Sequence, residues 1–312
     1  MGIIDRLPAA LVLTGPTAIG KSAVALALAE KFPAEIISAD SRQVYRYMDI
    51  GTAKSTSEER ARVSHHFIDI CDPDEAYSAG QFGREARTCV LEILQREKLP
   101  LIAGGSGLYL RALLQGLSGP LPSDRRLQEE LKRRVRREGS AALHAELEQI
   151  DPLSAQHLHP NDVHRIVRAL EVFYVKNISQ RQLWKTAAVP APFAYQIFIL
   201  NLERKLLYER IDRRVEHMFA CGLVEECRLL LDRGYSPEHT ALRTVGYQEV
   251  IQYLRGELSY AEMVALVQRH SRQYAKRQLT WFRRIVDGIW LDLSATESAG
   301  AVADRIVEMM RR

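Results

Sequence analysis

The N-terminal third of the chain alternates short apolar runs with longer stretches of helical periodicity. The apolar runs Ala9–Thr14, Glu35–Ser38 and Leu99–Ala103 predict buried strands. Between them, Ser22–Lys31 and Gly83–Arg96 carry apolar residues at helical spacing and predict helices. Because strands that alternate with helices form parallel sheets, this region predicts an α/β fold.

The pattern changes after a helix predicted over residues 108–117. From residue 120 to residue 193 the sequence is helical in character and contains no clear strand. The sheet then resumes with a strand predicted at Ala194–Leu202, and another strand is expected near the C-terminus, at Gly288–Leu293. We also expect long helices over about 203–232 and 259–284, and a final helix at the C-terminus.

These patterns predict three parts along the chain. Residues 1–119 form the first part of an α/β core, residues 120–193 form an all-helical insertion, and residues 194–312 form the second part of the core with the C-terminal helices.

Composition places the chain among soluble globular proteins. Of its 312 residues, 46% are hydrophobic and 26% are charged, and no apolar run approaches the roughly 18 residues of a membrane-spanning helix. The four cysteines include no C-x-x-C pair, so neither a disulfide framework nor a thiolate zinc site is indicated. We expect a cytoplasmic protein, and no protein partner is indicated, so we expect a monomer.

Arginine dominates the positive charge. The net charge is only +4, but 34 of the 43 cations are arginine, with clusters at Arg125–Arg126 and Arg133–Arg137 in the predicted insertion. Arginine binds phosphates with two hydrogen bonds and stacks on bases, which fits a nucleic-acid partner. A GC-rich genome would produce the same excess, so composition alone leaves the partner open.

A phosphate-binding loop follows the first predicted strand. The sequence GPTAIGKS matches G-x-x-x-x-G-K-[ST] in full, between a strand and a helix as the motif requires. Backbone N–H groups of such a loop hold a diphosphate, Lys21 adds a positive charge, and the Ser22 hydroxyl ligates Mg²⁺. An ordinary glycine turn is the alternative. The predicted diphosphate-binding residues are Gly15, Pro16, Thr17, Ala18, Ile19, Gly20, Lys21 and Ser22, and the predicted fold is a P-loop NTPase-like parallel sheet.

One residue expected of a P-loop ATPase or GTPase is missing. Such enzymes usually hold Mg²⁺ with an aspartate at the end of a later strand. Here the Leu99–Ala103 strand is followed by glycines, whereas an acid, Asp40, follows the second strand. The carboxyl end of a parallel strand borders the crevice where such folds bind ligands. Asp40 is therefore a candidate catalytic acid or base, and the alternative is that it caps a helix.

Seven segments together resemble the bacterial tRNA dimethylallyltransferase family, in the family's order and over nearly the whole chain. Within the second segment, DSRQVY (40–45) and MDIGTAK (48–54) are more specific than the P-loop itself. The seven segments are GPTAIGKS, SADSRQVYRYMDIGTAK (38–54), HHFIDICDPDEAYSAGQF (65–82), GGSGLY (104–109), HPNDVHRIVRALE (159–171), VGYQE (245–249) and AKRQLTWFR (275–283).

The resemblance implies transfer of a dimethylallyl group from dimethylallyl diphosphate to N6 of an adenosine in tRNA. In the family this adenosine lies directly 3′ of the anticodon in tRNAs that read U-starting codons. The P-loop there holds the isoprenoid diphosphate. The implied catalytic residues are Asp40 as general base, with Thr17, Lys21 and Arg214 at the diphosphate and Ser22 at Mg²⁺.

The resemblance also implies a set of tRNA contacts. Ser106 stands where the family often has threonine, and Gln128 stands where relatives often have arginine, which puts the Gln128 contact in doubt. Gln43 is the expected reader of a base edge. The implied tRNA-binding residues are Asp40, Ser41, Arg42, Gln43, Ser106, Gln128, His164, Arg165, Arg168, Arg243, Gly246 and Tyr247.

Three other functions stay open at this point. An adenylate isopentenyltransferase would share the P-loop and Asp40, but would not need the arginine-rich helical insertion. A P-loop small-molecule kinase would consume ATP. A tRNA-binding module with a vestigial P-loop is the non-enzymatic alternative, and the presence of Lys21, Ser22 and Asp40 together argues against it. The partners expected are tRNA and dimethylallyl diphosphate, with Mg²⁺ as cofactor.

Overall fold

The computed structural model describes residues 10–117, 124–179, 182 and 189–310. The chain divides into two compact units, Met1–Leu113 with Ala191–Arg312, and Leu114–Pro190. The first unit holds the sheet and the second is the helical insertion. The predicted start of the first strand at Ala9, and the predicted domain boundary between residues 119 and 120, lie outside the described residues.

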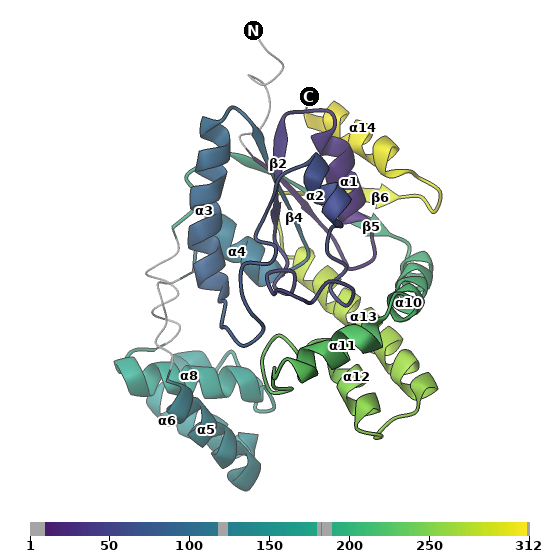
Figure 1. Ribbon diagram of the computed structural model, residues 1–312. Helices are drawn as coiled ribbons and strands as arrows, with labels where there is room; N and C mark the ends of the chain where they lie inside the picture. Colours follow the sequence, from purple (N-terminus) through teal and green to yellow (C-terminus); the bar gives the residue numbers. More distant parts are fainter. Residues whose placement is uncertain (1–9, 118–123, 180–181, 183–188, 311–312) are drawn as a thin grey trace. The chain divides into compact units, whose positions relative to one another are not determined.

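The first unit is built on a six-stranded sheet in which every neighbouring pair is parallel (Figure 1). The strand order is β3-β2-β4-β1-β5-β6. The predicted parallel α/β fold is therefore confirmed. The strands are β1 (Ala10–Thr14), β2 (Ala34–Ser38), β3 (His65–His66), β4 (Leu99–Gly104), β5 (Tyr195–Leu202) and β6 (Gly288–Leu293).

The register of the three central strands brings their following loops together. β4 lies between β2 and β1, where Ala103 pairs with Ser38 and Gly104 pairs with Thr14. Parallel strands end at one edge of a sheet, so the loops that begin at Gly15, Ala39 and Gly105 lie side by side there. That edge is where parallel α/β folds bind ligands.

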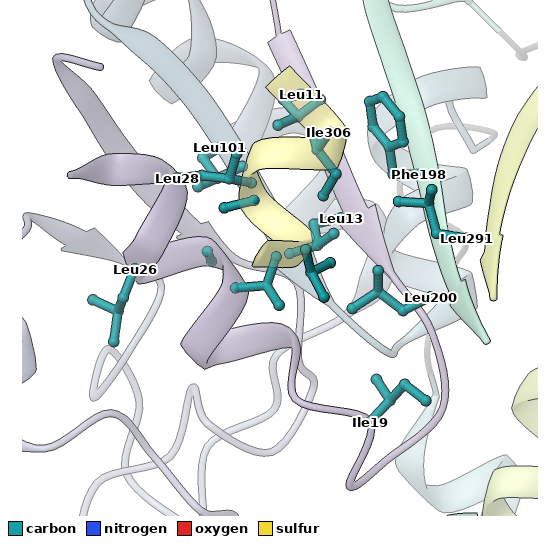
Figure 2. Packing of buried hydrophobic residues seen from close by; sticks show 14 of the residues in the cluster. Leu11, Leu13, Ile19, Leu26, Leu28, Leu101, Phe198, Leu200, Leu291 and Ile306 are labelled. Atoms are coloured by element: carbon teal, nitrogen blue, oxygen red, sulfur yellow. The ribbon is translucent and has the colours of Figure 1, made fainter. Parts of the chain in front are cut away.

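Alternate residues of the central strands point to one face of the sheet and form the core there. Leu11 and Leu13 of β1, with Phe198 and Leu200 of β5, belong to one buried cluster. The same cluster includes residues of α1 (Lys21–Ala29) and of α14 (Ala299–Met310), such as Ile306, which Figure 2 shows among the leucines of the strands. Burying these apolar side chains fixes α1, and with it the P-loop, on the sheet.

Seven further helices lie in the described part of the first unit. One predicted helix is divided in two in the structure. The sequence predicts one helical stretch over 203–232, but Gly222 has φ +99° and separates α10 from α11. The two-residue strand β3 and the short helices α2 and α12 are too brief for periodicity to predict. The helices are α2 (Ser57–Arg62), α3 (Ala79–Gln95), α4 (Gly107–Gln115), α10 (Arg204–Ala220), α11 (Leu223–Asp232), α12 (Tyr247–Leu254) and α13 (Tyr260–Phe282).

The second unit has its own small core. Leu131, Leu143, Leu147 and Leu170 are buried against one another. Its described residues contain helices and no strand: α5 (Arg125–Glu138), α6 (Ser140–Ile150), α7 (Pro152–Ala155) and α8 (Val163–Lys176). Across the described parts of both units, no helix is long and apolar enough to cross a membrane.

Candidate active site

The P-loop leads from β1 into α1 through backbone conformations that favour glycine. Gly15 has φ +151°, and a Cβ there would lie 2.7 Å from the carbonyl oxygen of Leu200. Gly20 has φ +102° and caps α1, which begins at Lys21. The unpaired N–H groups and the partial positive charge of this helix start favour an anion. The loop therefore suits an anionic group, of which the predicted diphosphate is one.

Lys21 lies along the loop, with its ammonium group turned back toward it. Its Nζ donates to the carbonyl oxygens of Gly15, at 2.9 Å, and Pro16, at 2.8 Å. Burial lowers the pKa of Lys21 to about 7, the cation of Arg214 contributes to this lowering, and Asp40 opposes both effects. Two cations therefore meet in a poorly solvated place, which an anionic group would neutralise.

Arg214 projects from α10, the helix that follows β5. Burial lowers the pKa of its guanidinium and the charge of Asp40 raises it. Arg214 lines the same cavity as Thr17 and Asp40. The structure thus brings together the four residues predicted to be catalytic, Asp40, Thr17, Lys21 and Arg214, although they come from three distant parts of the sequence.

Asp40 follows β2 and is half-buried. Its Oδ1 accepts the N–H of Arg42 at 2.8 Å, so the carboxylate closes a turn over residues 40–42. No helix begins here, because residues 41–44 form a turn. The alternative that Asp40 caps a helix is therefore wrong. One carboxylate oxygen has this N–H as its partner, and the side chain borders the cavity.

Ser106 holds the Asp40 segment from the neighbouring glycine loop. Its Oγ accepts the N–H of Ser41 at 2.9 Å, and its own N–H donates to the carbonyl of Ala39 at 3.2 Å. A Cβ on Gly104 would lie 2.2 Å from that same carbonyl oxygen. The hydroxyl expected to touch the target nucleotide is thus engaged in positioning Asp40.

Gln278 of α13 connects the P-loop with the same glycine loop. Its Oε1 accepts the N–H of Thr17 at 2.9 Å, and its Nε2 donates to the carbonyl of Gly105 at 2.9 Å. The side chain is buried. Gln278 is not among the predicted site residues, although it stands in the AKRQLTWFR segment. Its role becomes visible only when α13 is placed beside the loops.

Glu226 of α11 holds a second loop, the one that follows Asp40 in the sequence. Its carboxylate accepts the backbone N–H groups of Asp49 at 2.8 Å, Ile50 at 2.7 Å and Gly51 at 3.1 Å. The Tyr247 hydroxyl donates to the same carboxylate at 2.6 Å. Sequence reasoning missed Glu226, because one acid in an amphipathic helix carries no signal of this role.

The side chains of two residues predicted to touch tRNA, Tyr247 and Gln43, instead contact other parts of the same unit. Tyr247 is fully buried, and a Cβ on Gly51 would lie 2.4 Å from its ring. Its side chain is therefore no surface for tRNA. The amide of Gln43 accepts from the Ser38 hydroxyl at 2.8 Å and donates to the carbonyl of Thr52 at 3.3 Å. Both residues fix the loop over residues 43–52.

A cavity of about 420 Å³ lies between these elements, within the first unit. Asp40, Thr17 and Arg214 meet at it, with Arg42, Arg243 and Gly246 among the other polar and backbone lining groups. Tyr274 and Arg277 of α13 also line it. Burial raises the pKa of Tyr274 to about 12, and the charge of Asp40 adds to this effect. One wall is apolar and consists of Ile211, Val215, Met218 and Val267.

The predicted tRNA contacts in the second unit fall into two groups. Gln128 and Arg168 both bond to the carboxylate of Glu171, a fully buried residue that also accepts the N–H of Asp124 at 2.7 Å. These hydrogen bonds are internal to the unit. His164 and Arg165 are exposed on α8. A concave surface on α5 presents Arg126, Arg133, Arg134 and Arg137 beside Glu129 and Glu130.

Among the residues described here, no group of three or more His, Cys, Asp and Glu side chains could hold a metal ion by itself. Mg²⁺ in phosphate sites, however, commonly takes one or two protein ligands and completes its shell with phosphate oxygens and water. The exposed Ser22 side chain at the start of α1 fits that mode of binding.

Fold and site together define a P-loop α/β protein in which an anion-favouring loop lies close to a carboxylate. Residues 43–285 match the family model described as IPP transferase. The chain is 48% identical to tRNA dimethylallyltransferase 1 of Syntrophotalea carbinolica over 290 residues, 92% of each chain. It is 47% identical to the tRNA dimethylallyltransferase of Exiguobacterium sp., over 91% of this chain and 90% of the relative.

Two solved structures agree with this. The tRNA isopentenylpyrophosphate transferase of Bacillus halodurans superposes with a TM-score of 0.70 at 38% identity, over 96% of both chains. A eukaryotic dimethylallyltransferase acting on tRNA superposes with a TM-score of 0.75 at 27% identity, over 92% of this chain and 74% of that one. The protein belongs to the IPP transferase family.

Proposed function

We propose that this protein transfers the dimethylallyl group of dimethylallyl diphosphate to N6 of the adenosine directly 3′ of the anticodon, in tRNAs that read U-starting codons, and releases pyrophosphate. The observation that carries the proposal is that Arg214 and Asp40 line one cavity and lie close enough to Lys21 of the P-loop for both charges to act on it, inside a chain of the IPP transferase family. Such a site can hold the leaving group and the nucleophile at the same time.

At the leaving group, the bond between C1 of the isoprenoid and the diphosphate oxygen breaks, and its electron pair stays on the diphosphate. The P-loop N–H groups, Lys21 and Arg214 face the charge that grows there. Donors fixed before the reaction stabilise this charge more than water does, because they need not reorganise. The same groups would bind the donor in its ground state.

At the nucleophile, the N6 nitrogen forms a bond to C1 and loses a proton. An adenine amino group is a poor nucleophile, since its lone pair is delocalised into the ring. The Asp40 carboxylate, held by Arg42 and supported through Ser41 and Ser106, would accept that proton. A positioned base of this kind contributes about 10²–10⁴-fold in rate. To reach Asp40, the adenosine has to leave the base stack and enter the cavity.

Mg²⁺ would be held by the Ser22 hydroxyl together with oxygens of the diphosphate, and it would supply further neutralisation of negative charge. The remaining groups act without it: Thr17 and Lys21 shape the loop, and Asp40 receives the proton.

The helical insertion would bind the tRNA body. Arg133 and Arg137 are exposed on α5, and exposed arginines supply affinity for phosphates. His164, Arg165, Arg42 and Arg243 are the other exposed or cavity-lining members of the predicted contact set. A tRNA substrate also fits the expected cytoplasmic location. The proposed reaction is one that a monomer could carry out.

The test is product identity. The protein is incubated with Mg²⁺, dimethylallyl diphosphate and either unmodified tRNA or AMP, and the digested products are analysed by mass. We expect N6-dimethylallyladenosine from tRNA and pyrophosphate in equal amount. Equal turnover of AMP would favour an adenylate isopentenyltransferase, and ATP hydrolysis at a comparable rate would favour a kinase. Binding of tRNA without product would leave only a binding module.

A further inference from the structure

Tyr47 has an unusual backbone for a bulky side chain. Its φ is +66°, in the left-handed region that aromatic residues rarely adopt, and 42% of the residue is exposed. Such strain persists where the surrounding structure enforces it, and it is found often at ligand sites. An exposed ring held in this way contributes little to the core.

The backbone on both sides of Tyr47 is fixed. The N–H of Arg46 donates to the carbonyl of Cys71 at 2.8 Å, and its guanidinium pairs with Asp72 at 3.0 Å. Two residues after Tyr47, the N–H groups of Asp49 and Ile50 bond to Glu226. The tyrosine ring is therefore presented from a rigid segment.

Two side chains that directly follow α11 lie beside the ring. The guanidinium carbon of Arg233 lies 3.9 Å from the centroid of the Tyr47 ring. The Tyr235 ring lies 6.5 Å away, centroid to centroid, at an interplanar angle of 30°. We call Tyr47, Arg233 and Tyr235 the aromatic platform. An aromatic ring with a planar guanidinium is the combination on which unpaired nucleobases stack.

The aromatic platform stands on the two loops that also border the cavity. The loop over residues 40–52 contributes Asp40 and Arg42 to the lining, and the loop over residues 233–246 contributes Arg243 and Gly246. The two loops are joined where Arg42 Nη1 donates to the carbonyl of Thr240 at 2.8 Å. A strand whose adenosine enters the cavity therefore has these loops as its nearest neighbours.

We propose that the aromatic platform stacks an unpaired nucleobase of the tRNA anticodon loop, adjacent to the adenosine that enters the cavity. The inference rests on the proposed function, since it takes tRNA as the substrate. The flat faces of the Tyr47 ring and the Arg233 guanidinium match the flat face of a base, and a base is the group that the aromatic platform would accept.

The test uses Tyr47→Gly, which should weaken tRNA binding without lowering the stability of the fold. Glycine adopts a positive φ without strain, so the melting temperature should stay unchanged or rise. The loss of one stacked base should weaken tRNA affinity by about 5-fold or more. Tyr47→Phe keeps the ring and should bind tRNA as the wild type does. Affinity for dimethylallyl diphosphate should be unchanged in both variants.

Two further measurements separate stacking from other causes. Tyr47→Asn also tolerates a positive φ but is less flexible than glycine, so it should reproduce the loss. The ratio of variant to wild-type affinity should be the same at about 50 and about 200 mM salt, because stacking releases no counterions.

Wild-type tRNA affinity in Tyr47→Gly, or a parallel loss of diphosphate affinity, would overturn the proposal. If wild-type protein modifies no tRNA, the proposed function has failed. If it does so and the variants bind normally, only the inference about the aromatic platform has failed.

Discussion

The side-chain oxygen of Gln278 accepts the backbone N–H of Thr17 at 2.9 Å, across 261 residues of sequence. Through its amide nitrogen, the same side chain holds Gly105 in the loop after β4. One buried amide from α13 therefore sets the P-loop against the segment that positions Asp40. Together with the register of the strands, this side chain fixes the spacing between the two ends of the reaction.

This relationship predicts the behaviour of Gln278→Met, which keeps the approximate volume and loses both hydrogen bonds. Misplacing reacting groups by a fraction of an ångström to an ångström costs about 10- to 100-fold in rate. We expect kcat to fall within that range and the KM for dimethylallyl diphosphate to rise, with tRNA affinity unchanged. Steady-state kinetics with each substrate varied in turn measure both effects.

The matched control is Gln273→Met, on the same helix but exposed to solvent. It should retain wild-type kinetics. If Gln278→Met also kept wild-type kinetics, the amide would have only a structural role.

The pKa of Lys21 predicts how diphosphate binding depends on pH. In the free protein burial lowers this pKa to about 7, so the ammonium loses its proton as pH rises through 7. Above that pH, binding the anion requires uptake of a proton. The Kd for dimethylallyl diphosphate should therefore rise between about pH 7 and about pH 9, by up to about 10-fold per pH unit. Calorimetry in buffers of different ionisation enthalpy also measures the proton taken up.

Lys21→Arg separates this effect from the titration of other groups, because a guanidinium stays charged over the whole range. Its affinity should be nearly independent of pH over the same interval. The same slope in wild type and variant would assign the titration to a residue other than Lys21.

The arginines of α5 should differ in their effects on tRNA binding. Arg133 is exposed, and Arg137 keeps 75% of its side chain exposed although it pairs with Glu138. Arg134 is only 27% exposed and pairs with both Glu138 and Glu146. Changing Arg133 and Arg137 to Ala should reduce the slope of log affinity against log salt by about 0.7–0.9 for each phosphate that is no longer neutralised. Binding titrations from about 50 to about 200 mM salt measure this slope.

Arg134→Ala serves as the comparison, because it removes an ion pair that links α5 to α6. It should lower the melting temperature and leave the salt slope close to that of the wild type. If the double variant Arg133→Ala and Arg137→Ala kept the wild-type slope of log affinity against log salt, those two side chains would not contact tRNA phosphates.

The sequence was sufficient for features that depend on local pattern. Buried strands, the P-loop between β1 and α1, and the position of Asp40 after β2 all follow from neighbouring residues. A break at Gly222 could have been predicted as well, because glycine commonly ends helices. β3 could not be predicted, since its two residues carry no periodicity.

Features that depend on distant contacts could not be predicted. Glu226 acts on backbone groups about 175 residues away in the sequence, and nothing near it marks that role. Gln128 and Arg168 fit a tRNA surface by sequence, yet both meet the buried carboxylate of Glu171. A polar side chain does not reveal from sequence alone whether its partner is a ligand or another part of the chain.

In the proposed reaction Asp40 takes the proton from N6 while Lys21 and Arg214 receive the diphosphate. Asp40→Asn separates these two roles, since asparagine keeps the shape and one acceptor for the Arg42 N–H but cannot serve as the base. The measurement is single-turnover transfer to tRNA, with both substrate affinities and the melting temperature recorded. We expect a rate lower by ~10²–10⁴-fold, with affinities nearly unchanged. A variant that melts earlier yet transfers at the wild-type rate would contradict the account and place the base at another residue.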